Sequence, residues 1–184
     1  ACPSALYYAT NQDQAPGQWT TAAIHPAAYD YAALSLDSNN HAHVSFYSME
    51  VIPGDYTSGG VGYLTNAPDG DWQPSEEVDE DWAACQREGM MTDIAVDADN
   101  VPHIVYVDDA YGNYNEDTKY ASRETGAWVT EAIDEGGCMS AGKAIAIDGN
   151  GYVHIGYYHR PTETMRIAEN TSGGWDVTTL ADGG

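Results

Sequence analysis

The sequence predicts an all-β protein built from a repeated unit of four short antiparallel strands. One template occurs three times, at residues 34–47, 94–107 and 145–158. A second shared segment follows each copy, at 61–72, 118–128 and 165–175, and a further copy of it, at 6–19, has no first half before it. No window keeps the apolar spacing of an amphipathic helix for more than a turn or two. Repeats of this length indicate one supersecondary unit that is used several times.

Each template predicts two strands joined by a tight turn. The turns are the segments DSNN, DADN and DGNG, whose residues tolerate positive φ and hydrogen-bond to their own backbone. From the alternation of apolar residues, one face of the central hairpin is predicted to carry Ile94 and Val96 together with His103, Val105 and Val107. Both faces are largely apolar, which is typical of a sheet covered on both sides.

The second shared segment predicts a third strand, a turn, and a fourth strand that begins at a tryptophan. These tryptophans are Trp19, Trp72, Trp128 and Trp175. Four-stranded units of this size with a recurring aromatic are typical of propeller blades. We therefore predict one β-propeller-like domain over residues 1–184, with a half blade at 1–30 and blades at 31–82, 83–137 and 138–184. A closed propeller needs at least about four blades, so these three and a half predict an incomplete ring.

The segments IAVDADNVPHIVYV and IAIDGNGYVHIGYY, followed by YA or IA and then by GAW or GGW, carry a family resemblance. This pattern resembles the blade repeat of bacterial secreted β-propellers of the sialidase-like (BNR) group, over about residues 5–184. The resemblance implies a secreted propeller. It does not select one activity, because that group includes lectins, glycosidases and scaffolds.

The charge balance of the chain excludes several partner classes. Six Lys and Arg residues stand against 29 Asp and Glu residues, for a formal net charge of −23. Such a field repels phosphate backbones and anionic membrane surfaces, so neither a nucleic-acid partner nor membrane insertion is expected. The 14 Tyr and 5 Trp residues indicate a folded chain rather than a disordered one. Carboxylates spread along the whole chain favour adaptation to salt-rich or calcium-rich surroundings over one cationic partner.

The cysteines predict an oxidising compartment. Cys85 and Cys138 fall in equivalent connections between units, shortly before Asp97 and Asp148. Neighbouring blades bring such connections together, so we predict a Cys85–Cys138 disulfide and an extracellular or cell-surface location. Cys2 is left over, either free or paired outside the chain. The alternative is three buried thiols in a reducing cell.

A histidine and an aspartate recur at fixed positions of the repeat, and each has two interpretations. His43, His103 and His154 could be metal ligands, but one histidine per blade is too widely spaced around a propeller axis, so packed or hydrogen-bonded residues are predicted. Asp37, Asp97 and Asp148 resemble the start of calcium loops. Turn-capping carboxylates are the preferred interpretation, because the later ligands of a calcium loop are missing.

The best calcium candidate is an oxygen-rich insertion at 108–117. Its candidate ligands are Asp108, Asp109, Asn113, Asn115 and Asp117. Hard cations prefer clustered carboxylate and amide oxygens, although the same residues would suit a solvated loop. No cofactor beyond this Ca²⁺ is predicted.

Aromatic residues in irregular loops are the candidate ligand-binding residues. The four recurring tryptophans could stack on sugars, but their periodicity favours packing between blades. Trp82, Tyr56, Tyr111 and Tyr114 have no such periodicity, and they are predicted to face a ligand.

No catalytic constellation is recognisable. A sialidase needs clustered arginines, whereas Arg87, Arg123, Arg160 and Arg166 fall at unaligned positions. The sequence lacks G-x-S-x-G, P-loop and H-E-x-x-H motifs. We therefore predict an extracellular, non-enzymatic module for protein assembly or ligand binding, with itself or another protein chain as partner and loops 48–60 and 108–117 for recognition. The alternatives are a glycan-binding, lectin-like propeller and a fragment of a glycoside hydrolase or sialidase-like enzyme.

The calcium site can be tested by metal removal. If the 108–117 insertion binds structural Ca²⁺, a chelator should lower the melting temperature, because a ligand that binds only the folded state stabilises it. Calorimetry with and without chelator measures this. An unchanged melting temperature would remove structural calcium.

Overall fold

The computed structural model describes residues 5–26, 28–50, 58–79, 90–109, 116–134 and 142–182. It consists of four antiparallel sheets of two to four strands. In this described part of the chain the only helical element is a short 3₁₀ turn, η2 (Arg160–Thr162). The predicted all-β class is therefore confirmed.

The strands of every sheet are hydrogen-bonded in chain order, so each sheet is a simple meander. The first sheet contains β1 (Leu6–Thr10) and β2 (Thr20–His25). The second contains β3 (Ala28–Leu36), β4 (Ala42–Glu50), β5 (Ser58–Thr65) and β6 (Glu76–Asp79). The third contains β7 (Met90–Val96), β8 (Pro102–Asp109), β9 (Glu116–Ser122) and β10 (Val129–Asp134). The fourth contains β11 (Lys143–Ile147), β12 (Val153–His159), β13 (Thr164–Glu169) and β14 (Asp176–Asp182).

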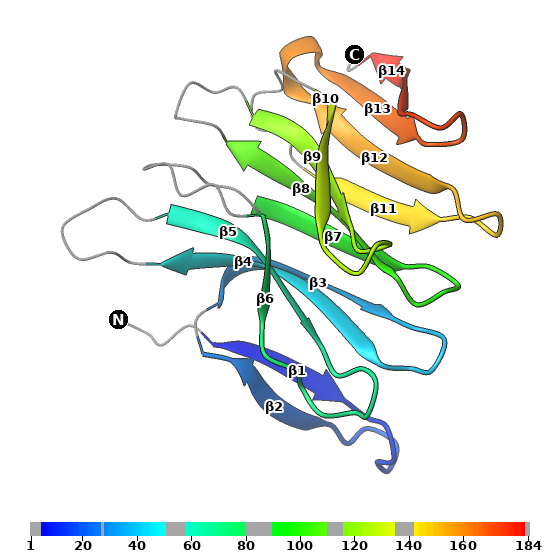
Figure 1. The fold of residues 1–184 in the computed structure, drawn as a ribbon. Coiled ribbons are helices and arrows are strands. Elements are labelled where there is room, and N and C mark those ends of the chain that lie inside the picture. The colour runs from blue at the N-terminus through cyan, green and yellow to red at the C-terminus, as the bar shows by residue number, and fades with distance from the viewer. Residues whose placement is uncertain are drawn as a thin grey trace.

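The sheets follow one another in the order of the chain, from β1–β2 at one end to β11–β14 at the other (Figure 1). Their first strands lie close together, since β7 contacts β3 and β4, and β11 contacts β7 and β8. The first sheet has only two strands, which correspond to the third and fourth strands of the other sheets. Strand β1 is therefore equivalent to β5, β9 and β13. Those three strands each pair with a second strand, whereas β1 pairs only with β2 among the described strands.

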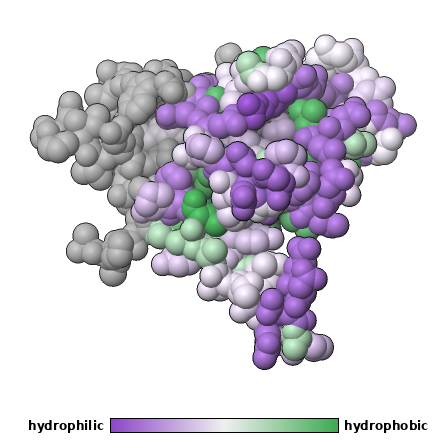
Figure 2. All heavy atoms as spheres, turned by 60° about the horizontal axis from the view of Figure 1, so that its bottom comes forward, coloured by the Kyte–Doolittle hydropathy of each residue, from purple (hydrophilic) through white to green (hydrophobic). Residues whose placement is uncertain are grey.

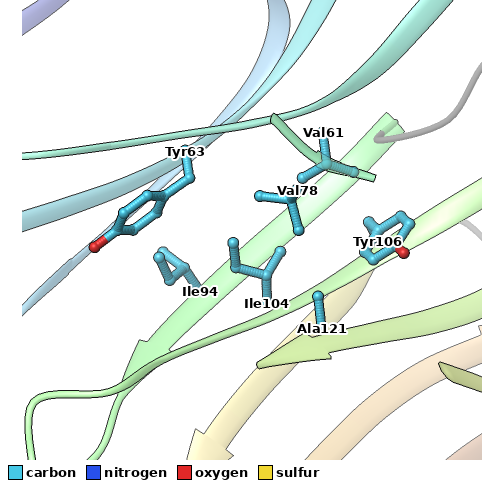
Figure 3. Close-up of a cluster of buried hydrophobic side chains, with 7 residues drawn as sticks. All are labelled: Val61, Tyr63, Val78, Ile94, Ile104, Tyr106 and Ala121. Carbon is cyan, nitrogen blue, oxygen red and sulfur yellow. The ribbon is translucent and has the colours of Figure 1, made fainter. Parts of the chain in front are cut away.

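The hydrophobic core is divided into three layers, one between each pair of neighbouring sheets. The layer between the second and third sheets joins Val61, Tyr63 and Val78 to Ile94, Ile104, Tyr106 and Ala121 (Figure 3). The next layer centres on Val105 and Tyr120 of the third sheet and on Val153, Ile155, Tyr157 and Ala168 of the fourth. In the remaining layer, Leu6 and Ile24 of the first sheet pack against Val44, Phe46 and Leu64. Each inner sheet is thus apolar on both faces, as the template predicts.

The predicted faces of the central hairpin were wrong in one respect. Ile94 lies opposite Ile104, and Ala95 lies opposite His103. Residues directly opposite in an antiparallel pair share a face, so Ile94 faces the second sheet with Ile104 while Val105 faces the fourth. The loop between Val96 and Pro102 sets this register, and a shift of one residue moves a side chain to the other face.

A β-bulge recurs between the third and fourth strands of all four sheets. The register shifts at Leu6/Tyr7, Val61/Gly62, Ala132/Asp134 and Met165/Arg166. The extra residues are Ile24, Val78, Ile133 and Leu180. A bulge re-aims the side chain of its extra residue, and in the first three sheets that side chain packs against the next sheet. Leu180 has no such neighbour in the described structure.

Two glycines that lie inside strands, Gly62 of β5 and Gly156 of β12, offer a test of this packing. The ring of Phe46 lies where a Cβ on Gly62 would be, whereas a Cβ on Gly156 would meet no atom within 4 Å. Gly62→Ala should therefore lower the free energy of unfolding by about 1–3 kcal/mol through overpacking. Gly156→Ala, the matched control, should change it by less than about 1 kcal/mol, with any change favouring the folded state. Urea unfolding measures both, and equal effects would contradict the described layer around Phe46.

Candidate functional site

The recurring aspartates cap the hairpin turns. In each turn one carboxylate oxygen accepts two backbone N–H groups at 2.7–2.9 Å. The pairs of donors are Asn39 and His41 for Asp37, Asp99 and Val101 for Asp97, and Asn150 and Tyr152 for Asp148. The residue three positions after each aspartate has positive φ, at Asn40, Asn100 and Gly151. These bonds confirm the turn-capping interpretation of the three aspartates.

The histidine that follows each turn is hydrogen-bonded inside its own sheet. His43 Nδ1 lies 2.6 Å from the Tyr63 hydroxyl, and His103 Nδ1 lies 2.5 Å from that of Tyr120. The other ring nitrogen faces the turn aspartate, at 3.7 Å in the second sheet and 3.4 Å in the third. In the fourth sheet, where Ile167 replaces the tyrosine, His154 instead pairs with Glu169 at 2.7 Å. This confirms the predicted structural role of the recurring histidines.

Burial sets the protonation of this Asp–His–Tyr cluster. Desolvation lowers the pKa of His43 below its ordinary value of 6.5, despite the nearby Asp37 carboxylate. Burial raises the pKa of Tyr63 to about 12. Although burial of Asp37 alone would raise its pKa, hydrogen bonds from the side chain of His41 and from the backbone of His41 and Asn39 hold it at about 2. The cluster is thus a buried neutral pair beside an ionised turn cap, and it offers no group that can reach a substrate.

The tryptophans pack between sheets, as their periodicity predicts. Each indole meets the tyrosine of the preceding sheet edge-on, with ring centroids 5.0–5.2 Å apart and planes at 67–70°. The pairs are Trp72 with Tyr8, Trp128 with Tyr63, and Trp175 with Tyr120. Trp19 occupies the same position in the first sheet, and it is 61% exposed because no preceding sheet covers it among the described residues.

A second recurring contact links the fourth strand of one sheet to the second and third strands of the next. Asp79 at the end of β6 accepts from the Tyr106 hydroxyl of the third sheet, and Lys119 lies 3.3 Å away. The corresponding Asp134 at the end of β10 accepts from Tyr157 and Arg166 of the fourth sheet. Sequence reasoning missed this contact, although an aspartate ends both strands and a cation stands at the same point of β9 and β13.

The outer faces of the first and fourth sheets leave apolar side chains exposed at positions that are buried or packed in the other sheets, and β3 of the second sheet does so as well. Leu34 of β3 is 53% exposed, whereas its equivalent Ile94 in β7 is 4% exposed. Leu180 is 61% exposed and Met165 is 45% exposed, whereas their equivalents Val78 and Val61 are 6% and 0% exposed. The exposed residues share a repeat position with core residues, so the difference comes from the absence of a covering sheet in the described structure. This pair of open faces is the candidate functional surface.

The predicted calcium ligands are only partly described. Asp108 and Asp117 lie opposite one another on β8 and β9, and Asp109 follows Asp108 at the end of β8. Asp108 forms an ion pair with Lys119 at 2.5 Å, so an ammonium already neutralises part of its charge. Asn113 and Asn115 lie outside the described residues. Among the residues that are described, no three His, Cys, Asp or Glu side chains are placed to hold a metal ion together, and calcium binding stays a prediction.

Several further predictions fall on residues outside the described part of the chain. These are the ligand-facing aromatics Trp82, Tyr56, Tyr111 and Tyr114, the Cys85–Cys138 disulfide, and Cys2. No observation favours or opposes the glycan-binding alternative that depends on those aromatics. Where the chain is described, the model contains no helix of the length and apolarity needed to span a bilayer.

Comparison with known proteins supports the fold and leaves the function open. No family model matches the chain, and no curated protein matches it. A solved structure from Dyadobacter fermentans DSM 18053, described as a protein of unknown function, is similar with a TM-score of 0.64 and 11% sequence identity. The match covers 90% of this chain and 55% of that chain, so the present chain spans about half of its neighbour. The resemblance to the sialidase-like repeat therefore stays a prediction.

The buried histidine predicts how stability depends on pH. Because the pKa of His43 is lower in the folded state than its ordinary 6.5, the unfolded chain binds the proton more readily. This contribution to stability is present above pH 6.5 and is lost as the pH falls below it. We expect the melting temperature to fall between pH 7.5 and 5.5, and His43→Gln to reduce that fall. A free-energy change of 1 kcal/mol shifts the melting temperature by about 2–4 °C in a chain of this size, which calorimetry resolves.

The same pH slope in the wild-type protein and in His43→Gln would contradict the assignment of this effect to His43. His159 contributes with the same sign, since burial also lowers its pKa. A residual slope in the variant is therefore expected, and only the difference between the two proteins tests the cluster.

Proposed function

We propose that the protein is an extracellular, non-enzymatic, β-propeller-like segment whose function is protein assembly through its two open end faces. The observation that carries this proposal is the contrast in burial at equivalent positions. Met165 and Leu180 of the fourth sheet are exposed, while Val61 and Val78, at the same repeat positions in the second sheet, are core residues. Exposed apolar side chains at positions that elsewhere form a core are expected where a surface binds protein.

The arrangement of the sheets supports a propeller-like array. Successive four-stranded meanders pack face to face, with their first strands close together. Propellers place the first strand of each blade toward a common axis in the same way. Two end faces are then left open whenever a set of such sheets does not close into a ring.

The polar residues of the described structure support a non-enzymatic role. Recurrent Asp, His and Tyr side chains are taken up by turn capping and by contacts within and between sheets. His43, His103 and Tyr63 are buried, so they are not available to a substrate. The extracellular location rests on the predicted Cys85–Cys138 disulfide and on the strongly acidic composition.

The assembly proposal also predicts how association responds to salt. The formal charge of −23 makes two molecules repel one another, while the faces proposed to join them are apolar. At 0.15 M salt charges are screened beyond about 8 Å, and at 1 M beyond about 3 Å. Association through the open faces should therefore strengthen as salt is added, whereas association through ion pairs would weaken.

Light scattering coupled to size exclusion tests this function. The particle mass should exceed the 19.8 kDa of one chain, and it should increase with protein concentration and with salt between 0.05 and about 1 M, because repulsion is screened. A reductant arm shows whether Cys2 contributes. A 19.8 kDa particle under all of these conditions would contradict assembly through copies of the chain.

A further inference from the structure

The three interfaces inside the molecule follow one residue pattern. Each interface uses the bulge residue of the preceding sheet, and it places a tryptophan of the following sheet against an aromatic of the preceding one. Two of the three also use an aspartate at the end of a fourth strand that meets a cation on the following sheet. The open end faces can be compared with this pattern position by position.

The open face of the fourth sheet presents the preceding half of such an interface. Leu180 is its bulge residue, and Ile167 stands where Tyr63 and Tyr120 receive a tryptophan. Met165 takes the place of the buried Val61. Leu180 and Met165 are the most exposed apolar residues of this face, since no following sheet covers them.

The open face of the first sheet presents the other half of such an interface, the half that a following sheet contributes. Trp19 stands at the position of Trp72, Trp128 and Trp175, but in the described structure no preceding sheet packs against it. Tyr7 stands at the position of the cations Lys119 and Arg166, because both cations and Tyr7 occupy the second residue of the third-strand segment. Figure 2 looks at the molecule from this end, where hydrophilic residues cover much of the surface and apolar ones are few.

Both members of the aspartate–cation pair found at the inner interfaces are replaced by uncharged residues at the open faces. Inside the molecule Asp79 meets Lys119 and Asp134 meets Arg166. At the end of β14 the corresponding residue is Ala181, and on β1 the corresponding partner is Tyr7. An aspartate facing Tyr7, or a lysine facing Ala181, would leave a partly buried charge unpaired, which is costly. Ala181 and Tyr7 therefore remove both members of this charged pair together, one from each half of the interface.

We propose that the fourth sheet of one molecule binds the first sheet of a second copy, so that copies join head to tail. In this contact Trp19 of one copy packs on Ile167 of the other, beside Leu180 and Met165, and Tyr7 lies against Ala181. The two surfaces differ, so the interface is heterologous, and such contacts close into rings or extend into chains. This inference rests on the proposed assembly function and names the partner for it.

Variants that block one face each can test the direction of the contact. Trp19→Asp blocks the first sheet and Leu180→Asp blocks the fourth, and both side chains belong to residues that are 61% exposed. Exposed positions tolerate such changes in the folded state, which unchanged far-ultraviolet circular dichroism and melting temperature would verify. Val129→Asp is the matched control, because Val129 is an exposed apolar residue, 53% accessible, on the inner third sheet.

Each blocked variant alone should associate at least about tenfold more weakly than the wild type, as removal of a central anchor does. An equimolar mixture of the two should recover association, because the intact fourth sheet of Trp19→Asp fits the intact first sheet of Leu180→Asp. The mixed species should stop at a pair of chains, twice 19.8 kDa, since both outer faces are blocked. Val129→Asp should behave as the wild type does. Sedimentation velocity measures all five samples: the wild type, the two blocked variants, their mixture and the control.

Three results would overturn the inference. If the wild type associates and the mixture does not recover association, the contact is not head to tail, while the assembly function stands. If both blocked variants associate as strongly as the wild type, the contact lies elsewhere on the molecule. If the wild type is a single chain at every protein and salt concentration, the proposed assembly function fails too. The open faces would then bind a different protein or further repeats.

Discussion

Face-to-face packing between successive sheets is the interaction on which the rest of the structure depends. A sheet that is apolar on both faces is stable only when both faces are covered, and each inner sheet here packs against its two neighbours in the chain, although β3 of the second sheet stays open at Leu34. At roughly 25 cal/mol per Å² of apolar surface removed from water, these layers supply the main driving force for folding. Hydrogen bonds within a meander hold its strands together, but they do not hold one sheet against the next.

Polar contacts position the sheets rather than stabilise them by themselves. The Asp79–Lys119 and Asp134–Arg166 pairs lie at the outer strands, where they are partly exposed, and such pairs contribute little on average. Each pair also binds a tyrosine hydroxyl of the neighbouring sheet, which sets how far one sheet can slide over another. The edge-on Trp–Tyr contacts join the same pairs of sheets, so the geometry of these two layers is specified by the same residue types.

Repetition explains why the end faces are informative. In a molecule without repeats, an exposed leucine or methionine is ordinary. Here Leu180 and Met165 have counterparts at the same repeat positions, and those counterparts are core residues. The repeat thus supplies an internal reference for what a covered face looks like, and the open faces depart from it by lacking a neighbour rather than by changing chemistry. Ala181 and Tyr7 are the exceptions, because both lack the charge that their counterparts carry.

The sequence by itself determined the local structure of this protein. Asp37, Asp97 and Asp148 fold their own turns, the histidines and tryptophans recur at fixed distances from them, and short-range chemistry is enough to predict both. Only the tertiary structure decided which side chains share a layer. Ile94 faces Ile104 and not Val105, because the loop sets the strand register and a side chain changes face with every residue along a strand. The exposure of Leu180 and of Trp19 likewise depends on which sheet lies next to which. That is a property of long-range packing, and no local pattern encodes it.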